Sequence, residues 1–197
     1  MSAPPVLTSL RPVEIPVVET PRLRLRPHRR EDFPACVALW ADPRVTRYIG
    51  GKPLTREEVW ARFLRYAGSW YWLGFGYWAV EEILSGQFIE ELGFSQNERS
   101  FNPPAALLDD NGLTMPEVGW VLAPQFHGRG YATEAVLAAL AWGDAGIAVS
   151  HSFCIIHPDH RASIGVAEKC GFVEKARPLY HTEPTILFTR RSTATQP

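Results

Sequence analysis

The chain has 197 residues, of which 46% are hydrophobic and 21% are charged, the balance of an ordinary water-soluble globular protein. This length predicts one domain with room for a sizeable core. The formal net charge of -1 gives no electrostatic reason to expect nucleic acid or an anionic membrane as a partner. No apolar run is long enough for a transmembrane helix, so composition points to neither a nucleic-acid binder nor an integral membrane protein.

The two ends of the chain are predicted to lie outside the folded domain. Residues 1–18 are rich in proline and poor in charge, which predicts a flexible arm without a secretory leader. Residues 19–190 then form one domain, and residues 191–197 a frayed tail. Cys36, Cys154 and Cys170 lack C-x-x-C spacing, so they are interpreted as free core thiols in a reducing, cytoplasmic compartment.

In the first third of the chain, strand and helix patterns alternate. Residues 22–26 read Arg-Leu-Arg-Leu-Arg, which predicts a strand with buried leucines and a solvated arginine face. Glu31-Asp32 opens a helix that ends before Asp42-Pro43. Thr55-x-x-Glu58 is a capping box and predicts the start of a second helix.

Aromatic residues are dense between Trp70 and Trp78. They are interpreted first as packing between a helix and a sheet, and second as a wall of a ligand pocket. Residues 77–83 and 88–95 predict a hairpin that turns near Ser85-Gly86. The connection over residues 96–115 is long for a compact domain, which is typical of a loop that shapes substrate access.

The second half of the chain is predicted to contain a strand over residues 117–122, a glycine-bearing turn and a helix over residues 130–143. Ala132, Ala135, Val136, Ala139 and Leu140 recur at the spacing of one buried helix face. A further strand (residues 152–156), a helix (160–170) and two strands (172–178 and 184–189) follow. Asp159 is the expected N-cap of the last helix, and Gly171 its left-handed C-terminal residue.

The turn that holds Gly128 and Gly130 is a predicted anion site. The first N–H groups of a helix lack partners, and the helix dipole places partial positive charge there. Glycines allow the close backbone approach that a phosphate needs. A P-loop is ruled out because no Lys follows Gly130, and a dinucleotide fingerprint because Thr133 stands where its third Gly belongs.

A third phosphate-binding pattern, Q/R-x-x-G-x-G/A, matches residues 125–130 in full. Residues 155–163 and 167–172 add a strand, an H-P-x-x-x-x-S helix start and an E-K-x-G-F helix end. With these two motifs the chain resembles the GNAT superfamily of N-acetyltransferases from about Thr20 to Arg190. It is most similar to the branch that acetylates ribosomal-protein N-termini, which also contains small-amine acetyltransferases.

The resemblance implies a single α/β domain with a mixed, mostly antiparallel, splayed sheet flanked by helices. It also implies acetyl-CoA as co-substrate, without a metal. The main chain of Trp120, Val121 and Leu122 would bond the pantetheine arm, with an N–H of Val121 or Leu122 on the thioester carbonyl. The remaining cofactor-binding residues would be His127, Gly128, Arg129, Gly130, Tyr131, Ala132, His160 and Ser163.

Two positions depart from the family pattern. His160 stands in place of an Asn at the late helix start, and neutral His also offers one donor and one acceptor. Ala167 stands where many members carry a catalytic Tyr, which leaves Ser163 as the candidate to lie near the sulfur. His157 and His160 could suggest a metal site, but Pro158 breaks the spacing and no third ligand is evident.

For the general base, the expected residue is Glu117, with Glu90 and Glu91 as alternatives. The expected function is direct acetyl transfer to a primary amine, on either a small molecule or a protein N-terminus. A non-catalytic acyl-CoA-binding module and a nucleotide-binding protein remain as alternatives. The resemblance also allows a homodimer.

Overall fold

The computed structural model describes residues 13–193, and the fold is built on a central sheet. Its strands are β1 (Val18–Glu19), β2 (Leu23–Arg26), β3 (Tyr77–Glu82), β4 (Phe88–Ser95), β6 (Glu117–Leu122), β7 (His151–Ile156), β8 (Val173–Ala176) and β11 (Ile186–Arg191). Within the described residues their order is β1-β2-β3-β4-β6-β7-β11-β8. A smaller sheet, in the order β10-β9-β5, is made of β5 (Phe101–Asn102), β9 (Leu179–Tyr180) and β10 (Glu183–Pro184).

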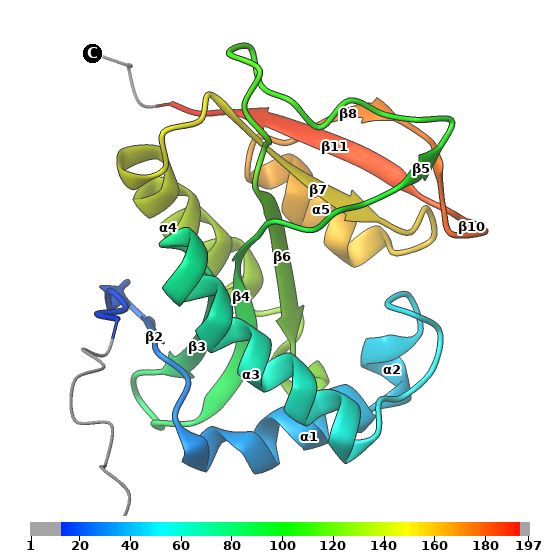
Figure 1. Ribbon diagram of the computed structural model, residues 1–197. Helices are drawn as coiled ribbons and strands as arrows, with labels where there is room; N and C mark the ends of the chain where they lie inside the picture. The colour runs from blue at the N-terminus through cyan, green and yellow to red at the C-terminus, as the bar shows by residue number, and fades with distance from the viewer. Residues whose placement is uncertain (1–12, 194–197) are drawn as a thin grey trace, which may run out of the picture.

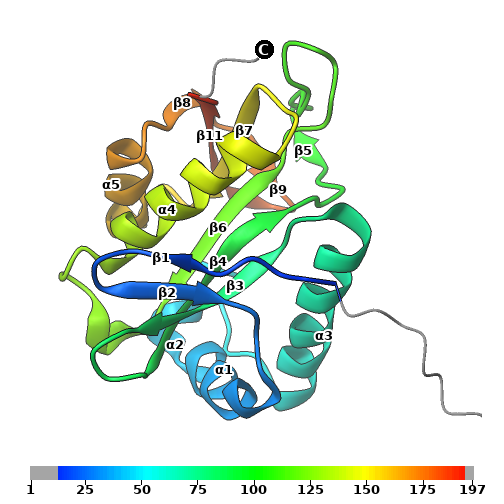
Figure 2. The ribbon, with the colours of Figure 1, turned by 90° about the vertical axis from the view of Figure 1, so that its left-hand side faces the viewer.

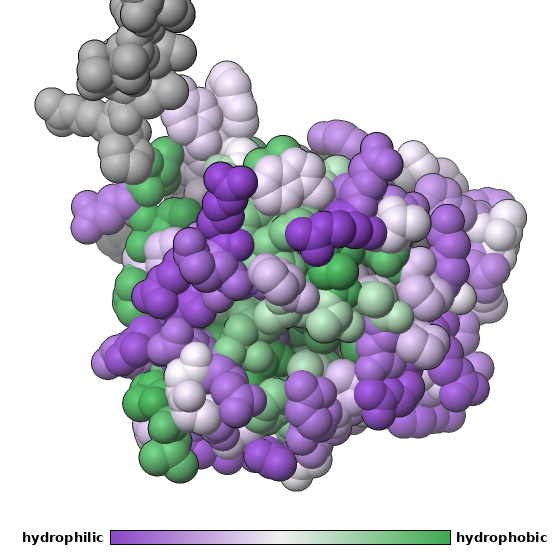
Figure 3. Space-filling model, turned by 90° about the horizontal axis from the view of Figure 1, so that it is seen from below, coloured by the Kyte–Doolittle hydropathy of each residue, from purple (hydrophilic) through white to green (hydrophobic). Residues whose placement is uncertain are grey.

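Helices cover both faces of the central sheet (Figures 1 and 2). One side carries α1 (Phe33–Ala41), α2 (Pro43–Thr46) and α3 (Arg56–Leu73), and the other carries α4 (Tyr131–Gly146) and α5 (Arg161–Lys169). Figure 3 views the end of the molecule where α1 lies, and there hydrophobic side chains gather in the middle within a hydrophilic rim. None of the helices in the described part of the chain has the length and apolar content needed to cross a membrane.

The sheet is splayed between β6 and β7. These two strands are parallel and share one registered pair, Glu117 with Phe153, whereas the other neighbours in the sheet are antiparallel. The Phe153 N–H donates to the Pro116 carbonyl at 3.1 Å, and beyond this point the strands diverge (Figure 1). The prediction of a mostly antiparallel, splayed sheet is confirmed.

The core between the sheet and α4 is aromatic on the sheet side and mostly small on the helix side. Trp78 and Phe94 are buried under the predicted helix stripe, in which Ala135, Val136, Ala139 and Leu140 are all 2% exposed or less. Gly143 permits this close packing, because a Cβ there would lie 2.5 Å from the Phe94 ring. The apolar spacing therefore predicted the buried face of α4 correctly.

The arginines on and beside β2 are paired, and the prediction of a solvated arginine face is wrong for Arg26 but holds for Arg22 and Arg24, whose side chains are 45% and 37% exposed. Arg26 is 4% exposed and bonds to Asp32 at 2.7 Å and to Glu81 at 2.8 Å. Arg24 shares Glu81, and Arg22 pairs with Glu134 of α4 at 2.6 Å. The leucines of the alternation, Leu23 and Leu25, are fully buried as expected. The charged residues of this strand thus tie the sheet edge to the elements beside it.

Other local predictions have mixed outcomes. The capping box is present, since the Thr55 hydroxyl accepts from the Glu58 N–H and the Glu58 carboxylate from the Thr55 N–H. Gly171 has φ of 84°, the predicted left-handed value. Asp159 is not the N-cap of α5, because His160 takes that place without a side-chain cap bond. The three cysteines are free and buried, as predicted.

The structure also corrects some predicted boundaries. Val18 was assigned to the flexible arm but pairs with Leu25 in the sheet. Arg191 was assigned to the tail but is the last residue of β11 and pairs with His151 of β7. The long connection before β6 contains β5 and an isolated bridge between Leu108 and Thr114. Neither β9 nor β10 was predicted, because two-residue strands carry no alternation to detect. Residues 1–12 and 194–197 lie outside the described residues.

Candidate active site

A cavity of about 550 Å³ opens where β6 and β7 separate. One side of its wall is the β6 segment from Glu117 to Val121, and the opposite side is β7 with His160 and Ser163 of the α5 start. Trp40 of α1, Arg62 of α3 and the loop after α2 close it from the helix side. The segment that holds β9 and β10 closes it from above, together with Arg99. The volume is in the range of small-molecule binding sites.

The edge of β6 that faces this gap has free main-chain groups. The Ala123 N–H donates to the Ile89 carbonyl of the β3–β4 side, and the direction of N–H groups alternates along a strand. The N–H of Val121 therefore points to β4, while those of Trp120 and Leu122 point to the gap. Because β7 pairs only at Glu117, an extended ligand could bond to Trp120 and Leu122 as an added strand.

The glycine turn has the backbone geometry expected of an anion site. Gly128 and Gly130 have φ of 76° and 78°, values that favour glycine, and Gly130 is the N-cap of α4. Gly130 offers no capping side chain, and the first bond within the helix runs from the Glu134 N–H to the Gly130 carbonyl. The N–H groups of the first helical turn, from Tyr131 onward, are thus available to a ligand.

Neighbouring side chains fix this turn in place. Arg22 donates to the Arg129 carbonyl at 2.9 Å, and its guanidinium lies 4.5 Å from the centre of the Tyr131 ring. The Tyr131 hydroxyl donates to Glu82, and the His127 ring bonds to the Leu122 carbonyl at 3.0 Å. These contacts join the end of β6 to the start of α4, so the predicted pyrophosphate and pantetheine contacts form one continuous surface.

The predicted cofactor residues thus fall into two groups. Trp120, Val121, His160 and Ser163 line the cavity itself. The remaining predicted residues do not line it and instead form the end of β6 and the turn into α4: Leu122, His127, Gly128, Arg129, Gly130, Tyr131 and Ala132. This division suits a long ligand whose phosphate end lies outside the cavity and whose reactive end lies within it.

Ser163 and His160 form a pair at the start of α5. The Ser163 hydroxyl lies 3.3 Å from His160 Nε2, and the His160 ring stacks on Tyr48 at 4.7 Å. Burial lowers the pKa of His160, and the nearby His127 and His157 lower it further. His160 is therefore neutral at physiological pH and can both donate and accept a hydrogen bond. Ala167 is fully buried, so its position faces the core and not the cavity.

Glu117 lies at the closed end of the gap and is bound by other residues. Its Oε1 accepts from the Arg99 guanidinium at 2.6 Å, and its Oε2 accepts from Arg99 and from Asn97 at 2.9 Å. Glu117 is only 6% exposed, although it lines the cavity. Any proton that reaches this carboxylate must displace part of the Arg99 or Asn97 interaction.

The alternative carboxylates, Glu90 and Glu91, lie outside the cavity lining. Both are at most 1% exposed and point to opposite faces of β4. Burial raises the pKa of Glu90 to about 8, and among residues 13–193 neither of its oxygens has a hydrogen-bond partner. Burial also acts to raise the pKa of Glu91, but bonds from His28 and Trp40 outweigh it and lower that pKa. Their predicted role as alternative bases is thus unsupported.

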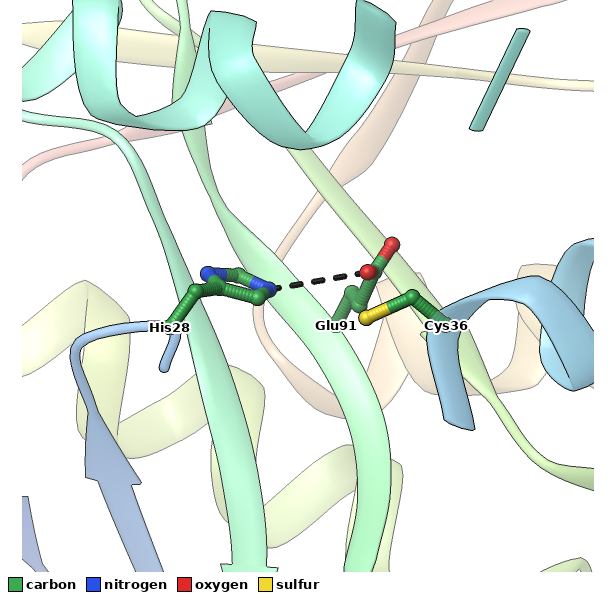
Figure 4. A group of neighbouring side chains, drawn as sticks. All are labelled: His28, Cys36 and Glu91. Atoms are coloured by element: carbon green, nitrogen blue, oxygen red, sulfur yellow. Dashed lines mark ion pairs between the residues drawn. The ribbon is translucent and has the colours of Figure 1, made fainter. Parts of the chain in front are cut away.

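Around Glu91, side chains from distant segments meet (Figure 4). His28 Nε2 lies 3.5 Å from Glu91 Oε1, and Cys36 approaches from α1. Within the described residues, these three form the group whose possible metal-ligand atoms all lie within 4.8 Å of one another. A metal would need Cys36 as a thiolate, but burial raises the pKa of that thiol, and Glu91 Oε2 already accepts from Trp40 and Tyr66. The cluster fits a hydrogen-bonded anchor better than a metal site.

Sequence reasoning missed several cavity residues. Tyr77, Arg62 and Arg99 line the cavity, but each lies in a different segment whose local pattern indicates a strand, a helix or a loop. Of the aromatic run from Trp70 to Trp78, Tyr77 lines the cavity, whereas Trp70 packs in the core and Trp72 is 81% exposed. The packing interpretation of that run is thus correct for Trp70, and the pocket interpretation for Tyr77.

A splayed sheet with a free strand edge, together with an uncapped helix start, is typical of an acyltransferase. The chain belongs to the GNAT acetyltransferase family, whose model, described as an acetyltransferase (GNAT) domain, matches residues 22–173. The recognised motifs and the fold expected from them are therefore confirmed.

Known proteins share this fold over nearly the whole chain. The uncharacterized protein YkkB of Bacillus subtilis is 28% identical over 177 residues, which cover 88% of this chain and 94% of YkkB. The crystal structure of an acetyltransferase from Agrobacterium tumefaciens is 27% identical, with a TM-score of 0.73 over 89% of this chain and 94% of that one. The ribosomal-protein-S5-alanine acetyltransferase of Vibrio fischeri, at 17% identity, shares the fold with a TM-score of 0.70 over 93% of this chain and 100% of its own.

Proposed function

We propose that this chain transfers the acetyl group of acetyl-CoA directly to a primary amine. The observation that carries the proposal is the gap between β6 and β7, which opens from a single registered pair into a cavity of about 550 Å³. The amine nitrogen would attack the thioester carbonyl carbon, the C–S bond would break, and the nitrogen would lose a proton while the thiolate gains one. No covalent enzyme intermediate is needed.

The coenzyme would lie across two main-chain surfaces. Its pyrophosphate would accept hydrogen bonds from the N–H groups of residues 127–132, where the α4 dipole favours negative charge. Its pantetheine arm would run along β6 and bond to the gap-facing groups of Trp120 and Leu122. The N–H of Leu122 or Trp120 would stabilise the oxyanion that forms on the carbonyl. Val121, whose N–H points to β4, would contribute only its side chain.

Proton transfer would use the two sides of the cavity. Ser163, paired with His160, is the proposed donor to the leaving thiolate, directly or through water. Glu117 is the proposed acceptor of the amine proton through a water chain, with Arg99 and Asn97 keeping it in place. Neutral His160 is the rival base, because it lines the same cavity and its pKa is lowered.

The acceptor would be a small amine or a protein N-terminus. The second class is supported by the fold shared with the Vibrio fischeri enzyme, whose name gives a ribosomal-protein alanine as its substrate. The first is supported by the cavity, which is closed from above by Tyr180 and by residues 183–185. Helices α1, α3 and α5 and the loop after α2 also contribute to the cavity.

The function is tested by incubating the protein with acetyl-CoA and a panel of small amines and peptides. The expected result is release of free thiol together with an acceptor that is one acetyl group heavier by mass spectrometry. Stabilisation by acetyl-CoA without turnover on any amine would instead support a non-catalytic binding module. Absence of both effects would overturn the proposed function.

A further inference from the structure

Arg62 of α3 is an unpaired cation in the wall of the cavity. Among the described residues, no carboxylate lies within 4.0 Å of its guanidinium, whereas Arg99 of the same wall is paired with Glu117. Arg62 is half-buried, so solvent screens its charge only in part. A guanidinium offers five N–H donors in a planar fork that matches a carboxylate. Within the described part of the chain, the Tyr66 hydroxyl is the polar group that interacts with Arg62, so most of this fork is left for a ligand.

The position of Arg62 is fixed by the aromatic residues below it. Its guanidinium carbon lies 3.9 Å from the centre of the Trp40 ring, a cation–π contact. The Trp40 indole N–H and the Tyr66 hydroxyl both donate to Glu91 Oε2, at 2.7 and 2.8 Å. Glu91 thus holds the platform on which Arg62 rests, but its own oxygens are occupied by Trp40, Tyr66 and His28.

The platform also places Arg62 near the point of acetyl transfer. The Tyr66 ring stacks on Tyr77 at 5.0 Å and 5°. The Tyr77 hydroxyl in turn lies against Gly119 of β6, because a Cβ built there would be 2.0 Å from it. Gly119 is next to Trp120, whose N–H faces the gap. Arg62, Tyr77 and Trp120 thus line the same cavity.

The other charges that face the cavity do not neutralise Arg62. Glu117 is already bound by Arg99 and Asn97, and Glu183 is exposed at the rim. Arg47 also lines the cavity and has no carboxylate of the described residues within 4.0 Å, but it is exposed and its charge is screened by solvent. Buried Glu91 attracts Arg62 from behind the wall but does not line the cavity. The lining itself holds three arginines and two glutamates, a balance that disfavours a polyamine and favours an acceptor with an anionic group.

We propose, building on the acetyl transfer proposed above, that the acceptor is a small amine that carries a carboxylate a few bonds from its nitrogen. Arg62 binds the carboxylate in a bidentate manner, and the amine then points toward Trp120 and the thioester. The class is that of amino acids and related amino carboxylates. The cavity volume of about 550 Å³, shared with the reactive end of the coenzyme, limits the acceptor to this size.

The test uses matched sets of amines that differ only at the carboxylate. Phenylalanine, methionine and leucine are each compared with the corresponding carboxamide and decarboxylated amine, at equal concentrations of free amine. With the intact protein, kcat/KM is expected to be about 10- to 100-fold higher for the carboxylate form of at least one set, as for a charge-assisted bidentate bond. Higher values for the neutral forms in every set would overturn the proposal.

Variants then assign the preference to Arg62. Arg62→Met should reduce the ratio between carboxylate and neutral forms to near one, mainly through KM, and Arg62→Lys should restore part of it. Arg65→Met is the matched control, because Arg65 lies on the same helix, is exposed and does not line the cavity. A ratio that survives Arg62→Met would overturn the assignment.

Binding separates this proposal from the proposed reaction. With coenzyme A present, carboxylate amines should raise the melting temperature of the intact protein but not that of Arg62→Met, and the decarboxylated amines should raise neither. If this pattern appears without any acetylation, the acceptor class stands and the transfer reaction fails. If acetylation occurs with no preference for a carboxylate, the transfer reaction stands and the proposed acceptor class fails.

Discussion

The hydroxyl oxygen of Tyr77 lies against the backbone of Gly119, so that a Cβ built on Gly119 would be 2.0 Å from it. Gly119 is in the β6 segment that lines the cavity, and Tyr77 reaches it from β3 across β4. The absence of a side chain at one residue thus allows a phenol to occupy the middle of the site. The same Cβ would be 3.2 Å from the Tyr77 ring carbon that bears the hydroxyl, so most of the clash comes from one oxygen atom.

This contact predicts a compensating pair of substitutions. Gly119→Ala should destabilise the protein by about 1–3 kcal/mol, the usual cost of overpacking, and should lower activity. Tyr77→Phe in the Gly119→Ala background should recover most of that stability, because it removes the atom at 2.0 Å. Urea unfolding of the four proteins in a double-mutant cycle measures the coupling. Additive effects would show that Tyr77 and Gly119 are not in contact.

The turn into α4 predicts a separation of stability from coenzyme binding. Gly130→Ala should cost about 1–2 kcal/mol of stability, because φ of 78° is unfavourable for a residue with a Cβ. It should also weaken coenzyme A binding about tenfold by disturbing the N–H groups that bind the pyrophosphate. Titration calorimetry with coenzyme A measures this loss.

Gly86→Ala is the matched control for that turn. Gly86 has φ of 66°, lies in the turn between β3 and β4, and has no atom within 4 Å of an added Cβ. It should lose similar stability while keeping coenzyme A affinity unchanged. Equal loss of coenzyme A affinity in both variants would show that the pyrophosphate does not bind at the start of α4.

Glu90 predicts a pH-dependent loss of stability. Its pKa is about 8 in the folded protein and near 4.5 when unfolded, so the folded state binds more protons between these values. Stability should therefore fall as pH rises from 4.5 to 8, by up to about 1.4 kcal/mol per pH unit, and then level off. Glu90→Leu should abolish this pH dependence. The free energy of unfolding of the variant, relative to that of the native protein, should therefore increase from pH 4.5 to pH 8.

Denaturant unfolding at pH 5, 6, 7 and 8 measures the effect of Glu90. Glu91→Leu is the contrasting variant, because Glu91 accepts bonds from Trp40 and Tyr66 and its loss should destabilise the protein throughout this range. A Glu90→Leu advantage that is constant with pH would show that Glu90 is ionised and has found a partner.

Glu117 is the predicted acceptor of the amine proton. Glu117→Gln should lower kcat by about 100-fold or more while leaving coenzyme A affinity unchanged. The variant also leaves Arg99 without its partner, so its stability must be measured alongside its rate. His160→Asn, which introduces the residue that the family pattern favours, should keep kcat within about tenfold. A larger loss for His160→Asn than for Glu117→Gln would assign the base to His160.

Local patterns in the sequence predicted the elements that are proposed to hold the coenzyme. Gly128 and Gly130 are recognisable because the turn requires positive φ, and the α4 stripe because its spacing is that of a helix. The capping box of Thr55 and Glu58 is likewise a contact between residues three apart. Each of these features is settled within a few residues of chain, where a sequence can be interpreted directly.

The acceptor side could not be predicted in this way, since its contacts join distant segments. Arg26 was expected to be solvated because its partner Glu81 is 55 residues away. Glu117 was expected to be a free base because Arg99 lies in a connection with no regular pattern. Arg62 is one of several charged residues on α3, and only the position of Trp40 distinguishes it. Tertiary contact, not local propensity, decides the chemistry of these side chains.

The small sheet makes the upper wall of the cavity a separable part of the molecule. Phe101 pairs with Tyr180 and Asn102 with Leu179, and the main sheet contributes no strand to this layer. Substitutions in these two segments can therefore change the acceptor side of the cavity without altering β6 and α4, where the coenzyme is proposed to bind. Grafting residues 96–116 and 178–185 together from a relative is the corresponding engineering route to a new acceptor.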